Sequence, residues 1–176
     1  MLITPTKIYE DFRNHNLDKQ SATDILLSLI ENSKNDIIRT ESIEIIEKIG
    51  YKKEKIFKIL ENLLISDTIK QVRIAAANAI KNNFLHKALT PMIWAIQNES
   101  SISCLRIINE CIIKIINTVV EKENKINKSI LIKEIKSITD YKFRDNINDI
   151  IEKGKIEAFS NEKLAQILID HIAISL

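Results

Sequence analysis

The sequence predicts an all-α fold, an α-solenoid of antiparallel helix pairs followed by a helical C-terminal extension or cap. Apolar residues recur at the 3.6-residue period of a helix along most of the chain. The 176 residues include two glycines and two prolines, too few for the turns of a β-sandwich or for a phosphate-binding loop. The apolar pattern also repeats, because Leu26, Leu60 and Met92 occupy equivalent positions 34 and then 32 residues apart.

The N-terminal part predicts one short helix and then a first helix pair. Thr4 followed by Pro5 is typical of an N-cap and a first helical turn. Ser21, with Asp24 three residues later, has the spacing of a capping box and predicts the start of the next helix. Gly50 predicts the end of the helix after that, because glycine readily adopts the left-handed conformation. The two stripes of this pair comprise Ile25, Leu26, Leu29 and Ile30, ending at residues 32–33, and then Ile38, Ser42, Ile45, Ile46 and Ile49.

Two further pairs follow with the same order of stripes. Thr90 and Pro91 predict the N-cap and first turn of the fifth helix. The third, fourth and sixth stripes comprise Ile56, Ile59, Leu60, Leu63 and Leu64, then Val72, Ala75, Ala76, Ala79 and Ile80, and finally Cys104, Leu105, Ile108, Cys111, Ile112 and Ile115.

A period of 30 to 45 residues made of two helices is typical of an α-solenoid. One helix pair exposes too much apolar surface to be stable alone, so it buries that surface against the next pair. We expect residues 1–117 to form the repeats with an N-terminal capping helix. Residues 118–176 are expected to form a helical extension that packs on the solenoid or continues it, with stripes around Ile130–Ile138, Phe143–Ile151 and Leu164–Ile172.

The segment from Asp67 to Ile80 resembles the second helix of a HEAT-type repeat, since an acidic residue precedes Val72-Arg73 and then spaced alanines. The other two repeats match in part, with Ser33 and then Ile38-Arg39 in the first, and Glu99 and then Cys104-Leu105 in the third. The resemblance covers about residues 18–117. It implies that Asp67 pairs with Arg39 and Arg73 across the layer between repeats, and that the small residues let the helices approach closely.

Bulk properties limit the possible locations and partners. No run of about 18 apolar residues is present, so we expect no membrane span, and the charged N-terminus does not match a signal peptide. These features predict a cytoplasmic protein. Cys104 and Cys111 lie about 10 Å apart on one helix face, too far for a disulfide, and are expected to be buried thiols. The net charge of +2 gives no large uniform field and argues against nonspecific binding of nucleic acid.

The sequence contains no constellation typical of an enzyme. His15, His86 and His171 fall in different elements, and no Cys-x-x-Cys is present, so we predict no metal, no cofactor and no catalytic residue. HEAT-like hydroxylases bind iron through His-Glu dipeptides, which the three histidines here do not form.

Three features remain as candidates for function. Trp94, the only tryptophan, is expected to fill space between helices, with an interface anchor as the alternative. Lysine clusters at 52–58 and 122–136 contain several glutamates and are interpreted as solvated surface, with phosphate contact as the alternative. The third feature is the exposed side of the second helices, which lines the concave face in HEAT-type proteins. Its candidate partner-binding residues are Glu41, Glu44, Asn78, Lys81, Arg106 and Glu110.

The leading hypothesis is a non-catalytic scaffold or adaptor that binds a protein along the concave face, where Glu44, Asn78 and Glu110 would form a polar ladder. One alternative is a nucleic-acid-binding protein of the HEAT-like glycosylase kind, and another is a helical-repeat subunit that attaches bilin chromophores. The apolar C-terminal residues 171–176 are expected to be buried in the domain or in a partner. A second copy of the chain is one such partner, which would give a homo-oligomer.

Overall fold

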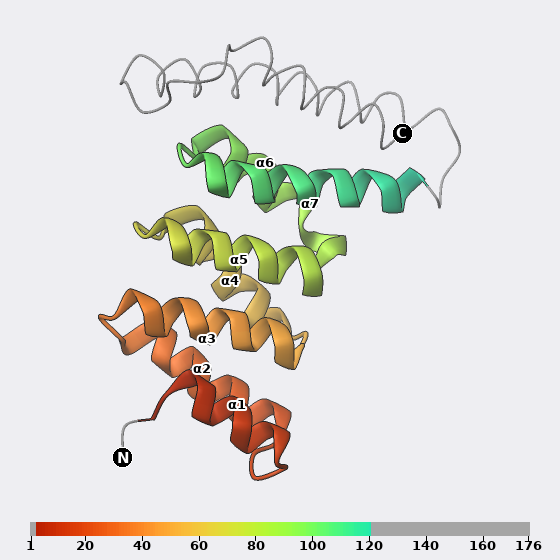
Figure 1. The fold of residues 1–176 in the computed structure, drawn as a ribbon. Helices are drawn as coiled ribbons and strands as arrows, with labels where there is room; N and C mark the ends of the chain where they lie inside the picture. The colour runs from red at the N-terminus through yellow and green to blue at the C-terminus, as the bar shows by residue number, and fades with distance from the viewer. Residues whose placement is uncertain (1–2, 121–176) are drawn as a thin grey trace. The chain divides into compact units, whose positions relative to one another are not determined.

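The computed structural model describes residues 3–120, which form seven α-helices and one 3₁₀ helix without any strand. The predicted all-α class is therefore confirmed for this part of the chain. The helices expected within residues 130–172 and the apolar C-terminus lie outside the described residues. In chain order the elements are α1 (Pro5–Arg13), α2 (Lys19–Asn32), α3 (Asp36–Ile49), α4 (Glu54–Ser66), α5 (Lys70–Asn83), η1 (Leu85–Lys87), α6 (Leu89–Asn98) and α7 (Ile102–Val120) (Figure 1).

The chain divides into two compact units, Met1–Pro91 and Met92–Leu176. The division falls inside α6, whose first turn belongs to the first unit. Helix α7 continues to Val120, beyond the end expected for the repeats at residue 117. The expected C-terminal extension, residues 118–176, lies outside the described residues from residue 121 onward.

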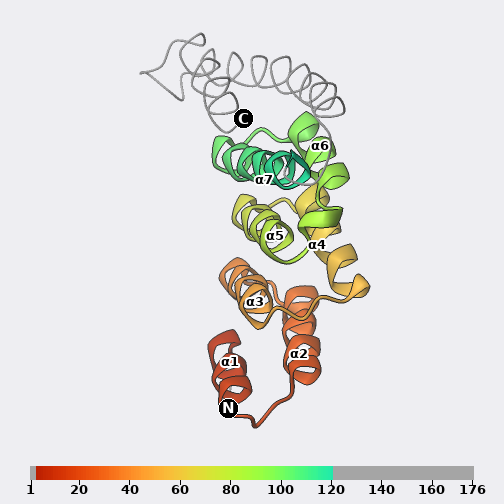
Figure 2. The ribbon, with the colours of Figure 1, turned by 90° about the vertical axis from the view of Figure 1, so that its right-hand side faces the viewer.

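In the first unit, α3 and α5 each contact more than one neighbouring helix. Helix α3 packs against α1, α2 and α5, and α5 packs against α3 and α4. Figure 2 shows the result as two layers, with α1, α3 and α5 in one and α2 and α4 in the other. Short loops at residues 33–35 and 67–69 join α2 to α3 and α4 to α5, so the helices of each pair run antiparallel.

The core of this unit lies between the two layers. Its largest fully buried side chains are Leu26, Ile43, Ile46, Leu60, Leu64, Val72 and Ile80. Most of them belong to the predicted stripes. Helix α5 differs from its neighbours because it buries Ala75, Ala76, Ala77 and Ala79, and these small side chains allow close contact with two other helices.

The 3₁₀ helix η1 closes the end of α5 against the start of α4. The rings of Phe57 and Phe84 lie 5.6 Å apart between their centroids. Lys87 forms an ion pair with Glu54, and its Nζ lies 5.6 Å from the centroid of the Phe57 ring. The cation lowers the pKa of the Glu54 carboxyl mainly through its hydrogen bond.

Two of the expected helix ends are confirmed. The backbone N–H of Lys7 donates to Thr4 Oγ1 at 3.3 Å, and Pro5 occupies the first turn of α1. Gly50 ends α3 with a φ of 65°, a left-handed conformation that is strained for residues with a Cβ atom.

The capping prediction for Ser21 is wrong, because α2 begins at Lys19 and its N-cap is Asp18. The backbone N–H of Ser21 donates to Asp18 Oδ1 at 2.7 Å, and the Ser21 hydroxyl donates to Asp18 Oδ2 at 3.0 Å. An ionised carboxylate accepts both bonds, so the earlier residue caps the helix. Thr90 is likewise not an N-cap, since α6 begins at Leu89.

The Asp18 cap predicts a specific pH dependence of stability. The bonds from Ser21 lower the pKa of the Asp18 carboxyl. A carboxyl whose pKa is lower in the folded chain contributes stability above its unfolded pKa and loses it as the pH falls through the folded value. Urea midpoints at pH 7 and pH 3 should therefore differ less for Asp18→Asn, a cap that does not titrate, than for the natural chain. An equal loss in both proteins would contradict this role.

In the second unit, α6 and α7 lie side by side (Figures 1 and 2). One face of α7 is buried from Cys104 to Ile115, through Cys104, Leu105, Ile108, Cys111, Ile112 and Ile115. Both cysteines are fully buried, as expected from their positions in the stripe. Trp94 on α6 is 42% exposed, so the prediction that it fills space between helices is wrong.

Candidate functional site

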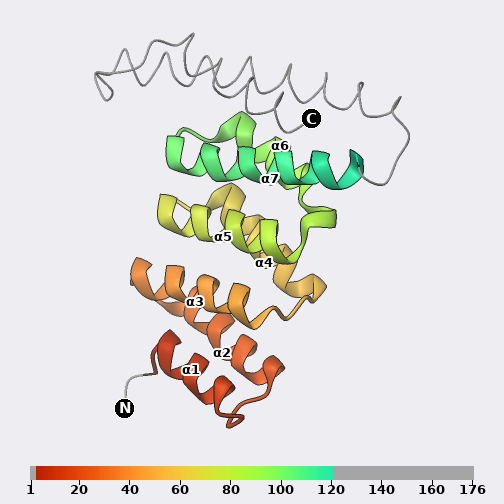
Figure 3. The ribbon, with the colours of Figure 1, turned by 45° about the vertical axis from the view of Figure 1, so that its right-hand side comes forward.

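Two adjoining hollows lie between α3 and α5, which run next to each other in the same layer (Figure 3). One, of about 350 Å³, lies where both helices begin and is lined by Asp36, Ile37, Thr40, Glu41, Ile69 and Gln71. The other, of about 390 Å³, lies farther along and is lined by Thr40, Glu44, Glu47, Lys48, Gln71, Ile74, Ala75, Asn78 and Asn82. Thr40 and Gln71 line both hollows, so we treat the two as one feature, the α3–α5 groove.

The groove forms because α3 turns its apolar side into the core and leaves its polar side facing the groove. Helix α3 buries its isoleucines at 43, 45, 46 and 49 together with Ser42. Ser42 can be buried because its hydroxyl donates to the carbonyl of Ile38 at 2.7 Å. The remaining side of α3 carries Ile37, Glu41, Glu44 and Lys48, separated by four, three and four residues. This spacing places them in a single row along the helix, and that row forms one wall of the groove.

The two walls of the groove differ in charge. The α3 wall carries Asp36, Glu41 and Glu44 before the first cation, Lys48. The α5 wall is uncharged, with the amides of Gln71 and Asn78 on either side of Ile74 and Ala75. Among the described residues, neither Glu41 nor Glu44 forms an ion pair. The groove is therefore acidic over most of its length, with amide side chains on the opposite side.

Polar contacts fix the distance between the two walls at the end of α3. The Asn82 side chain donates to Glu47 Oε1 at 2.8 Å, and the Asn83 side chain donates to the Glu47 carbonyl at 2.9 Å. Both bonds join α3 to α5, so direct contacts connect the two walls at this end of the groove.

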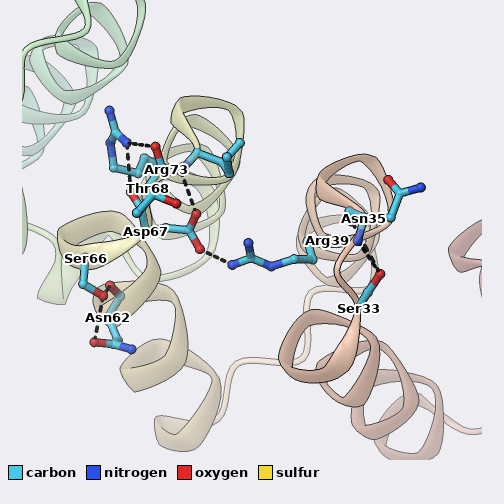
Figure 4. Close-up of polar contacts among 9 residues, drawn as sticks. Ser33, Asn35, Arg39, Asn62, Ser66, Asp67, Thr68 and Arg73 are labelled. Carbon is cyan, nitrogen blue, oxygen red and sulfur yellow. Dashed lines mark hydrogen bonds and ion pairs between the residues drawn. The ribbon is translucent and has the colours of Figure 1, made fainter.

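A partly buried ion pair joins α3 to the loop before α5 at the other end of the groove (Figure 4). Arg39 Nη2 of α3 donates to Asp67 Oδ2 in the loop before α5, and the two side chains are 18% and 6% exposed. Asp67 Oδ1 also accepts from the backbone N–H of Ile69 at 2.9 Å. The pairing of Asp67 with Arg39 that the resemblance implied is thus present.

Arg73 acts on the same loop in a different way. Its Nη1 donates to the backbone carbonyls of Asp67 and Thr68, at 2.8 and 3.1 Å (Figure 4). These bonds hold the loop in the conformation that presents the Asp67 carboxylate to Arg39. Together the two arginines determine where α5 begins relative to α3.

The structure brings three of the six predicted partner-binding residues to this groove. Glu44 and Asn78 line the same hollow, and Glu41 lines the adjoining one. Lys81 is half-buried farther along α5 and lines neither hollow. Arg106 and Glu110 are exposed on α7 in the second unit, so the ladder of Glu44, Asn78 and Glu110 stays a prediction.

Sequence reasoning missed Ile37, Thr40 and Gln71. Ile37 is 67% exposed although it begins an isoleucine-rich helix. A signal was available, because Ile37 falls outside the apolar stripe and four residues before Glu41. Thr40 and Gln71 carry no such signal, since only the packing of α3 on α5 places them together.

The other candidate features do not form a second site in the described part of the chain. His15 and His86 are exposed, and His171 lies outside the described residues. Residues 3–120 hold no group of three His, Cys, Asp or Glu side chains that could bind a metal ion. Within the same range, no helix has the length and apolar character needed to cross a membrane. Comparisons with protein-family models, curated proteins and solved structures give no match.

Proposed function

We propose that this chain is a short HEAT-like α-solenoid that acts as a non-catalytic protein–protein interaction module. Helix α3 packs on α5, and each also packs on the preceding helix of its pair, α2 or α4. This arrangement supports the solenoid. The Arg39–Asp67 ion pair between successive helix pairs supports the HEAT-like character. In this proposal α1 caps the N-terminal end, because it contacts both helices of the first pair.

The observation that carries the functional proposal is the α3–α5 groove. From Asp36 to Lys48 the groove follows three turns of α3, a length of about 18 Å at 1.5 Å per residue. An extended peptide rises about 3.3 Å per residue, so the groove has room for five or six residues. Its walls combine an exposed isoleucine with carboxylates and amides, so a peptide could make both apolar contacts and hydrogen bonds there.

The charge of the groove argues against the alternative of nucleic-acid binding at this site. Nucleic-acid affinity depends on neutralising phosphates with lysine and arginine. Here Asp36, Glu41 and Glu44 lie along the wall that a phosphate backbone would have to follow. We therefore assign a protein partner to this groove.

Affinity capture from the native cell tests the proposal. We expect the tagged full chain to retain at least one protein that Glu44→Lys/Asn78→Lys fails to retain. The two lysines replace a carboxylate and an amide inside one hollow and introduce repulsion and bulk. With the captured protein purified, we expect the double variant to bind it at least about tenfold more weakly, a loss of about 1.4 kcal/mol.

Asp24→Lys/Glu31→Lys is the control for this experiment. Both of its positions are exposed on α2, away from the groove, and the variant should retain the same protein. Circular dichroism should show all three proteins equally helical. Equal capture by the groove variant and the natural chain would contradict the proposal, and Glu110→Lys would then test α7 separately.

A further inference from the structure

We propose that the α3–α5 groove binds an extended peptide segment that carries one apolar and two basic side chains at alternate positions. This inference rests on the proposed function and adds the chemistry of the partner. Three features of the groove carry it: the exposed Ile37, the carboxylates of Glu41 and Glu44, and the amides of the α5 wall.

The spacing of the α3 row matches that of an extended chain. Glu41 and Glu44 follow Ile37 by four and seven residues, which correspond to about 6 and 10.5 Å along the helix. Alternate residues of an extended peptide point to the same side and lie about 6.6 Å apart. If an apolar side chain of the bound peptide contacts Ile37, the peptide residue two positions away lies opposite Glu41. The peptide residue four positions away lies about 3 Å beyond Glu44, and a lysine at that position is long enough to reach the Glu44 carboxylate.

The apolar end of the groove is defined by two isoleucines. Ile37 is 67% exposed, and Ile69 of the facing loop is half-buried in the same hollow of about 350 Å³. A single exposed isoleucine needs no explanation. An isoleucine that lines a hollow with a second one provides a contact surface for an apolar side chain, and such a contact would remove both from water.

The charged part of the groove selects for basic residues. Asp36, Glu41 and Glu44 are exposed or half-buried, and no described cation neutralises the two glutamates. Lysine or arginine on the segment would meet complementary charge there, whereas an acidic segment would be repelled. Lys48 follows Ile37 by eleven residues, about 16 Å along the helix. Its positive charge disfavours a third basic residue of the peptide at that end of the groove.

The amide side chains suit the backbone of an extended segment. Gln71 and Asn78 offer both donors and acceptors from the α5 wall. The backbone of an extended segment carries N–H and C=O groups that need such partners when they leave water.

Synthetic peptides test the proposal on the full chain. The probe is a fluorescein-labelled nonapeptide with one leucine and lysines two and four positions away, in a background of serine and glycine. Both chain directions are made, because the groove accepts either. One control peptide replaces both lysines with glutamate, and a second replaces leucine with serine. We expect at least one probe direction to bind at least tenfold more tightly than its glutamate control, with an affinity that falls as salt is added.

Variants of the chain assign the binding to individual side chains. Glu41→Lys/Glu44→Lys should weaken probe binding at least tenfold. Asp24→Lys/Glu31→Lys changes the net charge equally on exposed positions of α2 and should leave binding unchanged. Ile37→Ser should weaken binding of the leucine probe several-fold and leave binding of the serine control peptide unchanged. A general loss of folding would instead weaken the binding of both peptides.

Three results would overturn the inference. They are equal binding of the probes and their glutamate controls, no binding of either probe, and self-association of the chain that depends on Glu41 and Glu44. The two proposals remain distinguishable. If Glu44→Lys/Asn78→Lys loses a captured protein while no probe binds, the interaction function is retained and the basic–apolar chemistry is rejected.

Discussion

Asp67→Ala is expected to lower the free energy of unfolding by about 1–3 kcal/mol, because it removes one partner of a partly buried ion pair and the acceptor of a backbone hydrogen bond. Asp67 is 6% exposed and accepts hydrogen bonds from Arg39 and from the backbone of Ile69. After the substitution, Arg39 would lack its counter-charge in a site that is 18% exposed. Urea denaturation followed by circular dichroism measures the loss. Asp24→Ala, at an exposed position of α2, should change stability by less than about 0.5 kcal/mol.

A double-mutant cycle separates the ion pair from the other contacts of Asp67. Arg39→Met removes the charge and keeps most of the aliphatic stem. If the two groups interact as the structure shows, Arg39→Met/Asp67→Ala should cost less than the two single changes together, by about 1–3 kcal/mol. Strictly additive losses would mean that the ion pair contributes little to holding α3 against α5.

Ala76→Leu is expected to destabilise the protein by about 1–3 kcal/mol through overpacking. Ala76 is 0% exposed on α5, the helix that contacts both α3 and α4. A leucine at this position would push α5 away from one neighbour or force a strained rotamer. Gln71→Leu is the matched control, because it adds an apolar side chain to an exposed position of the same helix. An unchanged urea midpoint for Ala76→Leu would show that α5 is packed more loosely than the structure indicates.

Local signals in the sequence were sufficient to predict helices α1 to α5 of the first unit, though not the 3₁₀ helix η1. Gly50 and the Thr4-Pro5 pair mark helix ends whose backbone requirements few other residues meet. The predicted stripes contain Leu26, Ile46 and Leu60, which are all fully buried. These features depend on periodicity and on backbone conformation, which short segments encode by themselves.

Features that depend on the neighbours of a helix were not predicted. Ile43 and Phe57 are buried although they fall outside the stripes, since α3 contacts three helices and Phe57 packs on Phe84. Asp18 caps α2 in place of Ser21 because its carboxylate reaches two donors. A stripe derived for one contact face underestimates burial for a helix enclosed on several sides.

The candidate site was predicted only in part, because some of its residues come together only through the packing of neighbouring helices. Glu41, Glu44 and Asn78 were identified as the residues opposite the apolar stripes, and they line the groove. The contribution of Ile69 and Gln71 could not be predicted, because it depends on how the loop at 67–69 is held by Arg39 and Arg73. Periodicity identifies the exposed face of one helix, whereas a groove is defined by the packing of two.

Site-specific photo-crosslinking in the native cell tests the central claim most directly. A photoreactive phenylalanine replaces Glu44 or Asn78 in the groove, and in parallel Asp24 or Glu31 on α2. The account predicts that both groove positions crosslink to the same protein, and that neither α2 position does. Crosslinks from α2 alone, or no crosslink from either groove position, would contradict it.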